Sequence, residues 1–236
     1  MKTVTQIVAA LKKKGSEQTR KTFARHGAPG DMYGVKVADL KVIAKQIKGN
    51  QQLACQLYDS NNPDAQYLAG MVANGSQMTS KQLQSWAKNA SWSMVAEYSV
   101  PAVACENSAA RSLAIKWIKS KQESIASSGW STYAGLVAIM PDEELDTTEI
   151  KFLLDRIAKN IDAAPNRVRY TMNGFVIAVG SYLKPLLKQA KATAKAIGTV
   201  SVDVGDTACK VPLALERINK TEKSGRLGKK RPTIKC

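Results

Sequence analysis

The spacing of apolar residues along this chain restricts its fold more than any other feature of the sequence. Apolar side chains recur three or four positions apart within residues 37–48, 110–118 and 150–157, which places them on one face of a helix. Helix-breaking residues, such as those at 61–63 and 141–142, separate these segments. The pattern predicts about a dozen helices of about three turns each.

A strand-like pattern occurs in one short segment. Residues 199–204 (TVSVDV) alternate between polar and apolar side chains, but a segment of this length is too short to found a sheet. The sequence therefore predicts an all-α fold.

The predicted helices are organised in pairs. Segments with a small or aromatic start and an Ala-rich apolar face begin near Pro63, Ser91, Trp130 and Arg167, at a spacing of roughly 30 to 40 residues. One helix pair cannot bury its apolar face alone, so neighbouring pairs must stack. We expect an α-α superhelix of stacked antiparallel helix pairs, of the HEAT-like kind, with an extended concave surface. A compact helical bundle is the alternative.

Charge is the strongest signal in the composition. The chain contains 35 Lys and Arg residues against 19 Asp and Glu residues, which gives a formal net charge of +16. Such an excess predicts a polyanionic partner, because cations that neutralise phosphates release counterions. The alternative is a basic protein that is merely well solvated. The charges are segregated, however, with acids gathered at 142–149 and bases at 12–14, 41–48, 184–195 and 226–235, which predicts one positive face.

Residue types that are scarce in the chain exclude several kinds of chemistry. The only histidine is His26, which we expect to end a helix. The four cysteines are far apart: Cys55, Cys105, Cys209 and Cys236. Zinc sites and histidine triads need such residues in clusters, so we expect no metal and no cofactor. Free thiols are typical of a reducing cytoplasm, so we expect the protein to be cytoplasmic. We also expect it to be a monomer.

Membrane association is not expected. No apolar run reaches the roughly 20 residues that a membrane-spanning helix needs. Residues 1–15 superficially resemble a signal peptide, but their apolar part is short and is interrupted by Thr5 and Gln6. An amphipathic first helix is the better interpretation.

The character of the chain changes near its C-terminal end. We expect a helical repeat domain over residues 1–206, followed by a capping helix and a basic tail over residues 207–236. The end of the tail, EKSGRLGKKRPTIKC, is polar, basic and interrupted by glycine. It is either a solvated tail or a flexible arm that contacts phosphates, and the sign of its charge favours the arm.

The segment 164–183 (APNRVRYTMNGFVIAVGSYL) combines an apolar helix face with an adjacent polar stripe. Arg167, Arg169 and Asn173 lie close to this apolar seam, where burial without partners is costly. These side chains either face a concave surface and contact DNA, or form a polar surface stripe satisfied by a neighbouring repeat. The sequence favours neither interpretation.

Four segments give the chain a resemblance to a known family. They read YGVKVADLKVIAKQIK, SWSMVAEYSVP, GWSTYAGLVAIMPDEEL and RVRYTMNGFVIAVGSY, in this order. Together they resemble the HEAT-like-repeat DNA alkylation repair family, the AlkD-like alkylpurine DNA glycosylases. The similarity extends to about Leu183.

The resemblance implies a specific reaction. Glycosylases of this family remove cationic alkylated purines from duplex DNA, and an aspartate flanked by tryptophans stabilises the positive sugar that develops. In this chain the first tryptophan matches Trp92, but the aspartate matches Ala96 and an arginine of the cleft matches Tyr133. The second tryptophan matches Phe175. The aromatic residues are thus retained, whereas the acid and the arginine are not.

Glu97 is the nearest substitute for the missing acid. It is adjacent to Ala96 but about 100° away around the helix. Pro101 frees the carbonyl of Glu97 and can distort this turn, which would bring the carboxylate toward the cleft. The alternatives are that Glu97 is a surface carboxylate and that Trp92 is core packing. We favour the surface for Glu97 and the cleft for Trp92.

Two functions follow from these observations. The chain is either a DNA alkylation repair glycosylase with Glu97 as its catalytic residue, or a non-catalytic DNA- or RNA-binding scaffold. A protein-interaction scaffold explains the net charge less well. The expected partner is alkylated or distorted duplex DNA. The residues predicted to contact it are Trp92, Trp130, Tyr133, Arg167, Arg169, Asn173, Phe175, Lys184, Lys188, Arg226, Lys229, Lys230 and Arg231.

Overall fold

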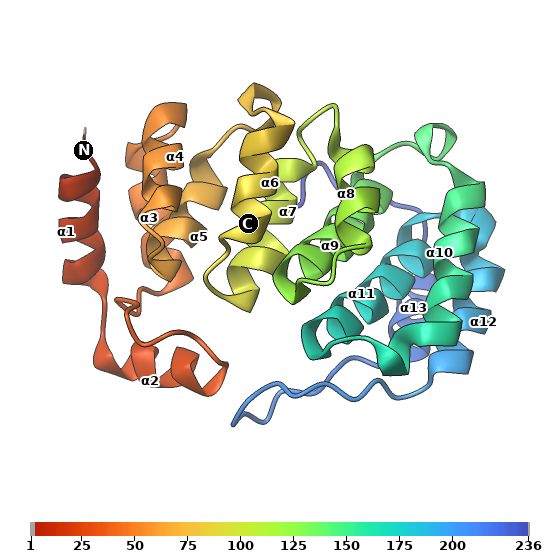
Figure 1. Cartoon of the computed structure of the whole chain (residues 1–236). Helices are drawn as coiled ribbons and strands as arrows, with labels where there is room; N and C mark the ends of the chain where they lie inside the picture. The colour runs from red at the N-terminus through yellow and green to blue at the C-terminus, as the bar shows by residue number, and fades with distance from the viewer. Residues whose placement is uncertain (1–2, 236) are drawn as a thin grey trace. The chain divides into compact units, whose positions relative to one another are not determined.

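The computed structural model describes residues 3–235, and this part of the chain folds into helices and loops without any strand (Figure 1). The all-α fold class is therefore confirmed. Residues 199–204, which alternate like a strand, form an extended loop instead. Among the described residues, no helix combines the length and the apolar character that crossing a bilayer requires.

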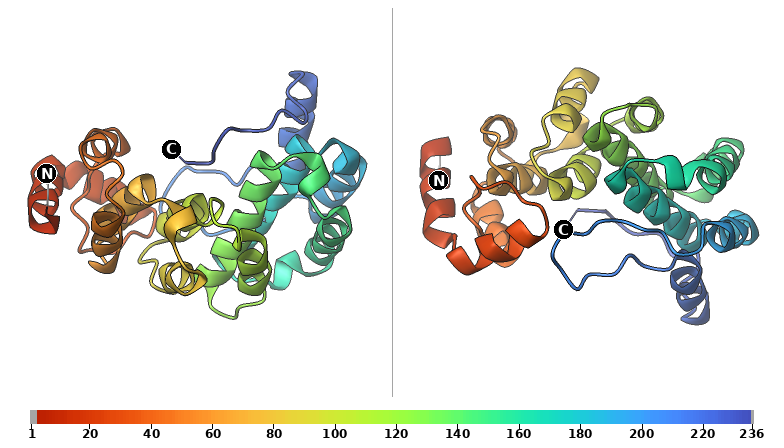
Figure 2. Two further views of the ribbon diagram at one scale, coloured as in Figure 1. Left: turned by 90° about the horizontal axis from the view of Figure 1, so that it is seen from above. Right: turned by 60° about the horizontal axis from the view of Figure 1, so that its bottom comes forward.

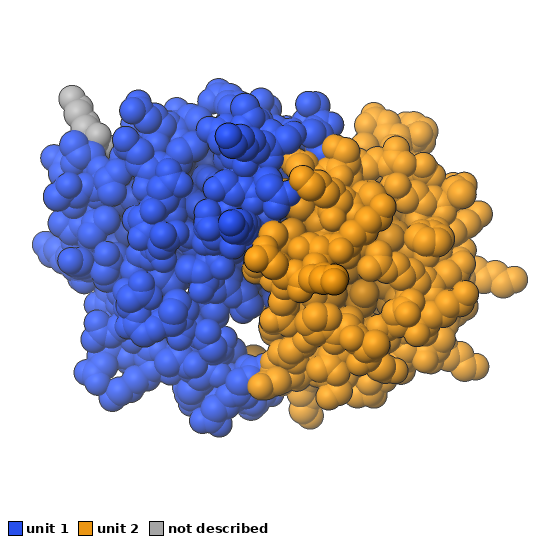
Figure 3. Space-filling view, in the orientation of Figure 1, with its two compact units in different colours: residues 1–109, 204–208, 235–236 blue, residues 110–203, 209–234 orange. Residues whose placement is uncertain are grey.

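The chain divides into two compact units, coloured separately in Figure 3. Among the described residues, the first unit comprises residues 3–109, 204–208 and 235, and the second comprises residues 110–203 and 209–234. This division differs from the expected boundary near residue 206, because α13 and most of the basic tail are grouped with the second unit's helices.

The helices of the first unit are α1 (Val4–Lys14), α2 (Glu17–Arg25), α3 (Val37–Gln46), α4 (Gln51–Asp59), α5 (Pro63–Val72), α6 (Ser80–Lys88) and α7 (Val100–Ala104). Those of the second unit are α8 (Ala110–Ile118), α9 (Glu123–Ile139), α10 (Thr147–Asn160), α11 (Asn166–Tyr182), α12 (Leu187–Ile197) and α13 (Ala214–Lys223).

Local sequence signals set many of the helix ends. Thr79 caps α6 with a capping box, in which its hydroxyl accepts from the Gln82 N–H and the Gln82 side chain accepts from the Thr79 N–H. His26 is the C-cap of α2, as expected, and Gly27 follows it with φ +73°. The N–H of Gly27 bonds to the Ala24 carbonyl, so that the helix ends in the left-handed turn that glycine favours.

A buried carboxylate organises the first unit. Asp64, in α5, accepts backbone N–H bonds from Tyr33 at 2.6 Å, from Gly34 at 3.1 Å and from Val35 at 2.9 Å. These bonds fix the loop between α2 and α3 against α5. Burial raises the pKa of Asp64, although the three N–H groups act in the opposite direction.

Two helices form the centre of the second unit. α9 and α11 lie side by side, and α13 packs against α11 and α12 (Figure 2). α9 has apolar or small residues on most of its circumference, as expected for a helix covered on all sides. Gly129 allows α8 to approach closely, because a Cβ at this position would lie only 2.6 Å from the Ile118 nitrogen.

We predict that Asp64→Ala lowers the free energy of unfolding by about 3 kcal/mol or more, because three N–H groups would lose a charged acceptor. Asp64→Asn keeps one acceptor oxygen and should cost less. Asp59→Asn, at an exposed position of α4, is the matched control and should change stability by less than about 0.5 kcal/mol. Urea denaturation measures all three. Equal stability of Asp64→Ala and Asp59→Asn would contradict the role of Asp64 in fixing the loop between α2 and α3.

Candidate nucleic-acid interface

The segment around Pro101 departs from regular helix. Residues Val95–Ser99 form a π-helical turn directly before α7, in which Pro101 is one of the first residues. Proline has no N–H to donate to the carbonyl four residues earlier, so the helix widens at this point. The distortion predicted from Pro101 is therefore confirmed.

The two residues considered for the family's acid are both covered. Ala96 is 2% exposed and Glu97 is 5% exposed. The interpretation of Glu97 as a surface carboxylate is therefore wrong. Its burial also removes the accessible carboxylate that the catalytic prediction requires. Glu97 therefore lies within the π-helical turn and in the interior of the first unit.

Trp92 has a partly structural role. Its indole N–H donates to the His26 carbonyl oxygen at 3.2 Å, and its ring lies 5.4 Å from that of Phe23 at a tilt of 47°. The side chain is half-buried and holds the C-terminal end of α2. Trp92 is thus neither fully core nor fully open to a cleft, since it packs against α2 and retains some exposed surface.

The other three predicted aromatic contacts belong to the hydrophobic core of the second unit. Trp130, Tyr133 and Phe175 have exposed fractions of 0%, 1% and 0%. Phe175 meets Trp130 and Tyr133 edge-to-face, with ring centroids 5.4 Å and 5.5 Å apart. A nucleic acid cannot reach these rings in this structure. The prediction that they form an exposed aromatic wall is corrected for this reason.

The hydroxyl of Tyr133 is used in a polar network. It donates to Glu149 Oε1 at 2.5 Å, and the same oxygen accepts from Arg111 Nε at 2.9 Å. Arg111 also pairs with Asp146 at 2.6 Å. Burial, followed by the bond to Glu149, raises the pKa of Tyr133. The position matched by the family's cleft arginine is thus occupied by a neutral residue that links α9 to α10.

The polar stripe of α11 faces protein atoms. Asn173 is 1% exposed, and its amide donates to the Pro212 carbonyl at 2.9 Å. The guanidinium of Arg167 stacks on Tyr170 at 4.5 Å, and its backbone N–H donates to Glu123. Arg169 is half-buried, and its Nε has no hydrogen-bond partner within residues 3–235. For Asn173 the predicted contact with DNA is replaced by a bond to the loop before α13.

The predicted basic residues differ in their availability. Lys184, in the 3-10 turn before α12, and Lys188, in α12, are exposed, as are Arg226, Lys229 and Arg231 of the tail. None of these five cations pairs with a carboxylate of the described chain. Lys230 is different, because its ammonium donates to the Val137 carbonyl at 2.9 Å and pairs with Asp142 at 2.8 Å. Its predicted contact with DNA is therefore corrected to a contact within the protein.

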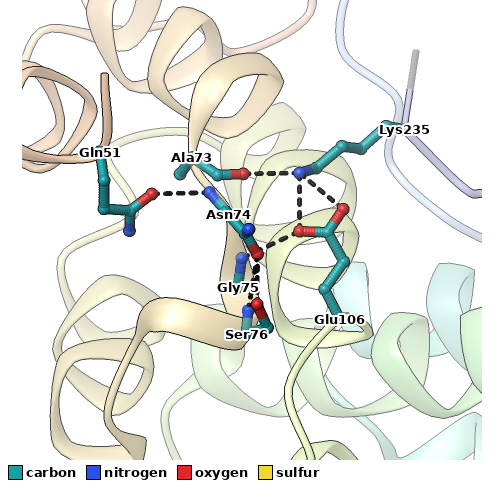
Figure 4. Close-up of polar contacts among 7 residues, drawn as sticks. All are labelled: Gln51, Ala73, Asn74, Gly75, Ser76, Glu106 and Lys235. Carbon is teal, nitrogen blue, oxygen red and sulfur yellow. Dashed lines mark hydrogen bonds and ion pairs between the residues drawn. The ribbon is translucent and has the colours of Figure 1, made fainter. Parts of the chain in front are cut away.

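A second lysine anchor, which was not predicted from the sequence, lies at Lys235. Lys235 donates to the Ala73 carbonyl at 2.5 Å and contacts both oxygens of Glu106, at 2.7 Å and 2.8 Å (Figure 4). Glu106 also accepts from the Gly75 N–H at 2.9 Å. The tail is therefore held by the protein, and the expectation of a flexible arm is corrected.

No metal site accompanies these residues. Within residues 3–235 no group of three or more His, Cys, Asp or Glu side chains is placed to hold a metal ion. In the acidic segment of the second unit, Asp146 and Glu149 pair with Arg111, and Asp142 pairs with Lys230. What the structure offers to a ligand is a set of exposed cations beside α12 and along the tail.

We predict that Tyr133→Phe lowers the free energy of unfolding by about 1–2 kcal/mol, because it removes the hydrogen bond to Glu149. DNA affinity should be unchanged, since the ring is buried and stays in place. Thermal denaturation and a DNA titration measure the two effects. Loss of DNA affinity in a fully folded Tyr133→Phe protein would contradict the structural role.

Comparisons with known proteins place this geometry in a family. The model of the family described as DNA alkylation repair enzyme matches residues 7–197. Uncharacterized proteins of Listeria innocua serovar 6a and Listeria monocytogenes serovar 1/2a are each 34% identical over 226 residues, or 93% of this chain and 97% of each relative.

A solved structure is also similar, with a TM-score of 0.90 and 33% identity over 99% of this chain and 100% of that chain. It is described as belonging to a new family of proteins related to the HEAT-like repeat DNA glycosylases with affinity for branched DNA structures. The HEAT-like fold predicted from the sequence is thereby confirmed. The chain belongs to the DNA alkylation repair family.

Proposed function

We propose that this protein binds DNA, with a preference for branched structures, and does not excise alkylated purines. Affinity for branched DNA is attributed to the similar solved structure, which matches nearly the whole chain. The HEAT-like fold that the two proteins share supports the transfer of this property.

One observation carries the proposal against catalysis. The positions that the family resemblance assigns to the acid, the arginine and the second tryptophan are Ala96, Tyr133 and Phe175, and each is at most 2% exposed. None of them offers a charge to a sugar cation at an accessible surface. An electrostatic group of this kind typically contributes about 100- to 1000-fold to a rate.

The distribution of charge supports the binding activity. The net charge is +16, and exposed cations without carboxylate partners remain on α12 and on the docked tail among the described residues. Charges of this kind attract the phosphate backbone independently of base sequence. A preference for branched DNA would come from the arrangement of several backbones around one protein, not from base contacts.

An alkylpurine glycosylase is the second candidate, because the matching family model is described as an enzyme. Glu97 would be its acid in this chain. Its 5% exposure supports the first candidate instead.

Binding is tested with a four-way junction and a linear duplex of the same base composition, each fluorescently labelled. We expect the junction to bind more tightly. We also expect both affinities to fall by about 10-fold or more between 50 and 200 mM salt, because counterions are released. Equal affinity for the two DNAs would contradict the preference for branches, and absence of binding to either would contradict the function.

Catalysis is tested with Ala96→Asp, which places the family's acid at its expected position. Because position 96 is buried, we expect the new carboxylate to destabilise the protein by about 3–5 kcal/mol and to give no release of methylated purines. Glu97→Gln serves as the companion variant and should not change the release of bases. Measurable excision by the unmodified protein that Glu97→Gln abolishes would establish the glycosylase instead.

A further inference from the structure

We propose that the docked tail is a preformed phosphate-binding strip, in which Arg226, Lys229, Arg231 and the neighbouring Lys184 contact the DNA backbone. Lys230 is not a contact residue but a positioning residue. This inference rests on the proposed DNA-binding function and assigns a surface to it. It lies entirely within the second unit.

The strip begins at the end of α13. Gly225 has φ +66°, its N–H bonds to the Glu222 carbonyl at 3.0 Å, and the Arg226 N–H bonds to the Thr221 carbonyl at 3.2 Å. This pair of bonds is the Schellman arrangement, which stops the helix and directs the chain sideways. Arg226 therefore leaves α13 in a defined direction.

The next residues attach to the ends of α11 and α9. The Gly228 N–H donates to the Ser181 carbonyl at 2.9 Å, and the Arg231 N–H donates to the Ala138 carbonyl at 2.8 Å. Both acceptors lie in the last turn of a helix, where carbonyl oxygens have no partner within the helix. The Lys230 ammonium occupies a third such carbonyl, that of Val137. Helix C-termini carry partial negative charge, which favours a basic segment here.

This docking separates the cations into two groups. Lys230 points inward and is neutralised by Asp142 at 2.8 Å. Arg226, Lys229 and Arg231 are exposed, although their backbone is held. The strip therefore presents its positive charges to solvent without a carboxylate of the described chain beside them.

Lys184 joins the strip through a close approach to glycine. A Cβ at Gly228 would lie 2.6 Å from Lys184 Cε and 2.8 Å from its Cγ, so the lysine stem runs directly along the glycine backbone. Gly228 also has φ +74°, which residues with a side chain rarely adopt. The turn closed by the Lys229 N–H on the Arg226 carbonyl, at 3.1 Å, thus brings cations from two distant segments together.

The chemistry of the strip fits phosphodiesters. Arginine donates two parallel hydrogen bonds to phosphate oxygens, and lysine adds a point charge. A segment already fixed to the protein loses less conformational entropy on binding than a free arm. The strip contains no exposed aromatic ring for stacking on bases, so it should bind the backbone without reading sequence.

The direct test compares two triple variants that remove the same charge. Arg226→Gln/Lys229→Gln/Arg231→Gln removes the strip's cations, and Lys41→Gln/Lys45→Gln/Lys48→Gln removes three exposed lysines at α3. We expect the strip variant to lose about 10- to 100-fold in junction affinity at 0.1 M salt and to flatten the salt slope by up to about 3. The α3 variant should lose clearly less.

A second pair tests the docking without any change in charge. Gly228→Ala strains the turn and pushes on the Lys184 stem, so we expect weaker junction binding. Gly174→Ala is the matched control, because nothing lies within 4 Å of its added Cβ and it should bind normally. A separate pair changes the anchor itself. Lys230→Gln removes one charge and should weaken binding and make the tail more sensitive to trypsin, whereas Lys230→Arg keeps the charge and should behave like the unmodified protein in both measurements.

The outcomes separate this inference from the function on which it rests. If the unmodified protein binds the junction and the two triple variants lose the same affinity, general charge explains binding and the strip is refuted. Full binding by Gly228→Ala and by Lys230→Gln would refute the positioning role. If the unmodified protein binds no DNA, the proposed function fails and the strip fails with it.

Discussion

The packing of α9 against α11 is the interaction on which the second unit depends. Both helices are covered on most of their circumference, and Trp130, Tyr133 and Phe175 fill the space around their contact. Burial of aromatic side chains is worth several kcal/mol, so these rings cannot also be displayed to a ligand. Positions that the family resemblance assigns to a reaction cleft are therefore part of the hydrophobic core of this unit.

The C-terminal ends of α9 and α11 also need hydrogen-bond donors for their free carbonyl oxygens. Carbonyl oxygens in the last turns of α9 and α11 accept from residues 228–231 of the tail. A basic tail suits this task because helix C-termini attract positive charge. The other cations of the same segment, Lys229 and Arg231, are exposed to solvent. The backbone of Gly228 and Arg231 and the side chain of Lys230 hold this stretch in place, and the side chains of Lys229 and Arg231 are the proposed DNA contacts, which links the core of the unit to its proposed activity.

Much of the fold was predictable from local patterns. Helical periodicity, the helix end at His26 and the distortion before Pro101 each depend on residues that are close in sequence. The site was less predictable, because it depends on burial and on distant partners. A helical pattern marks Phe175 as apolar but does not tell a core ring from a cleft ring. Nothing in the sequence distinguishes Lys230 from Lys229, since the carbonyl acceptor of Lys230 lies 93 residues away. The net charge predicted a polyanionic partner, but only the contacts in the structure identify which cations are exposed and without a carboxylate partner among the described residues.

The basic tail is docked in the free protein, and we expect it to stay docked when DNA is bound. Amide hydrogen exchange of residues 224–235, with and without a four-way junction, tests it most directly. We expect slow exchange at Gly228 and Arg231 in the free protein, because both N–H groups are bonded to helix carbonyls, and equal or slower exchange in the complex. Exchange in the free protein as fast as that of an unstructured peptide would contradict it.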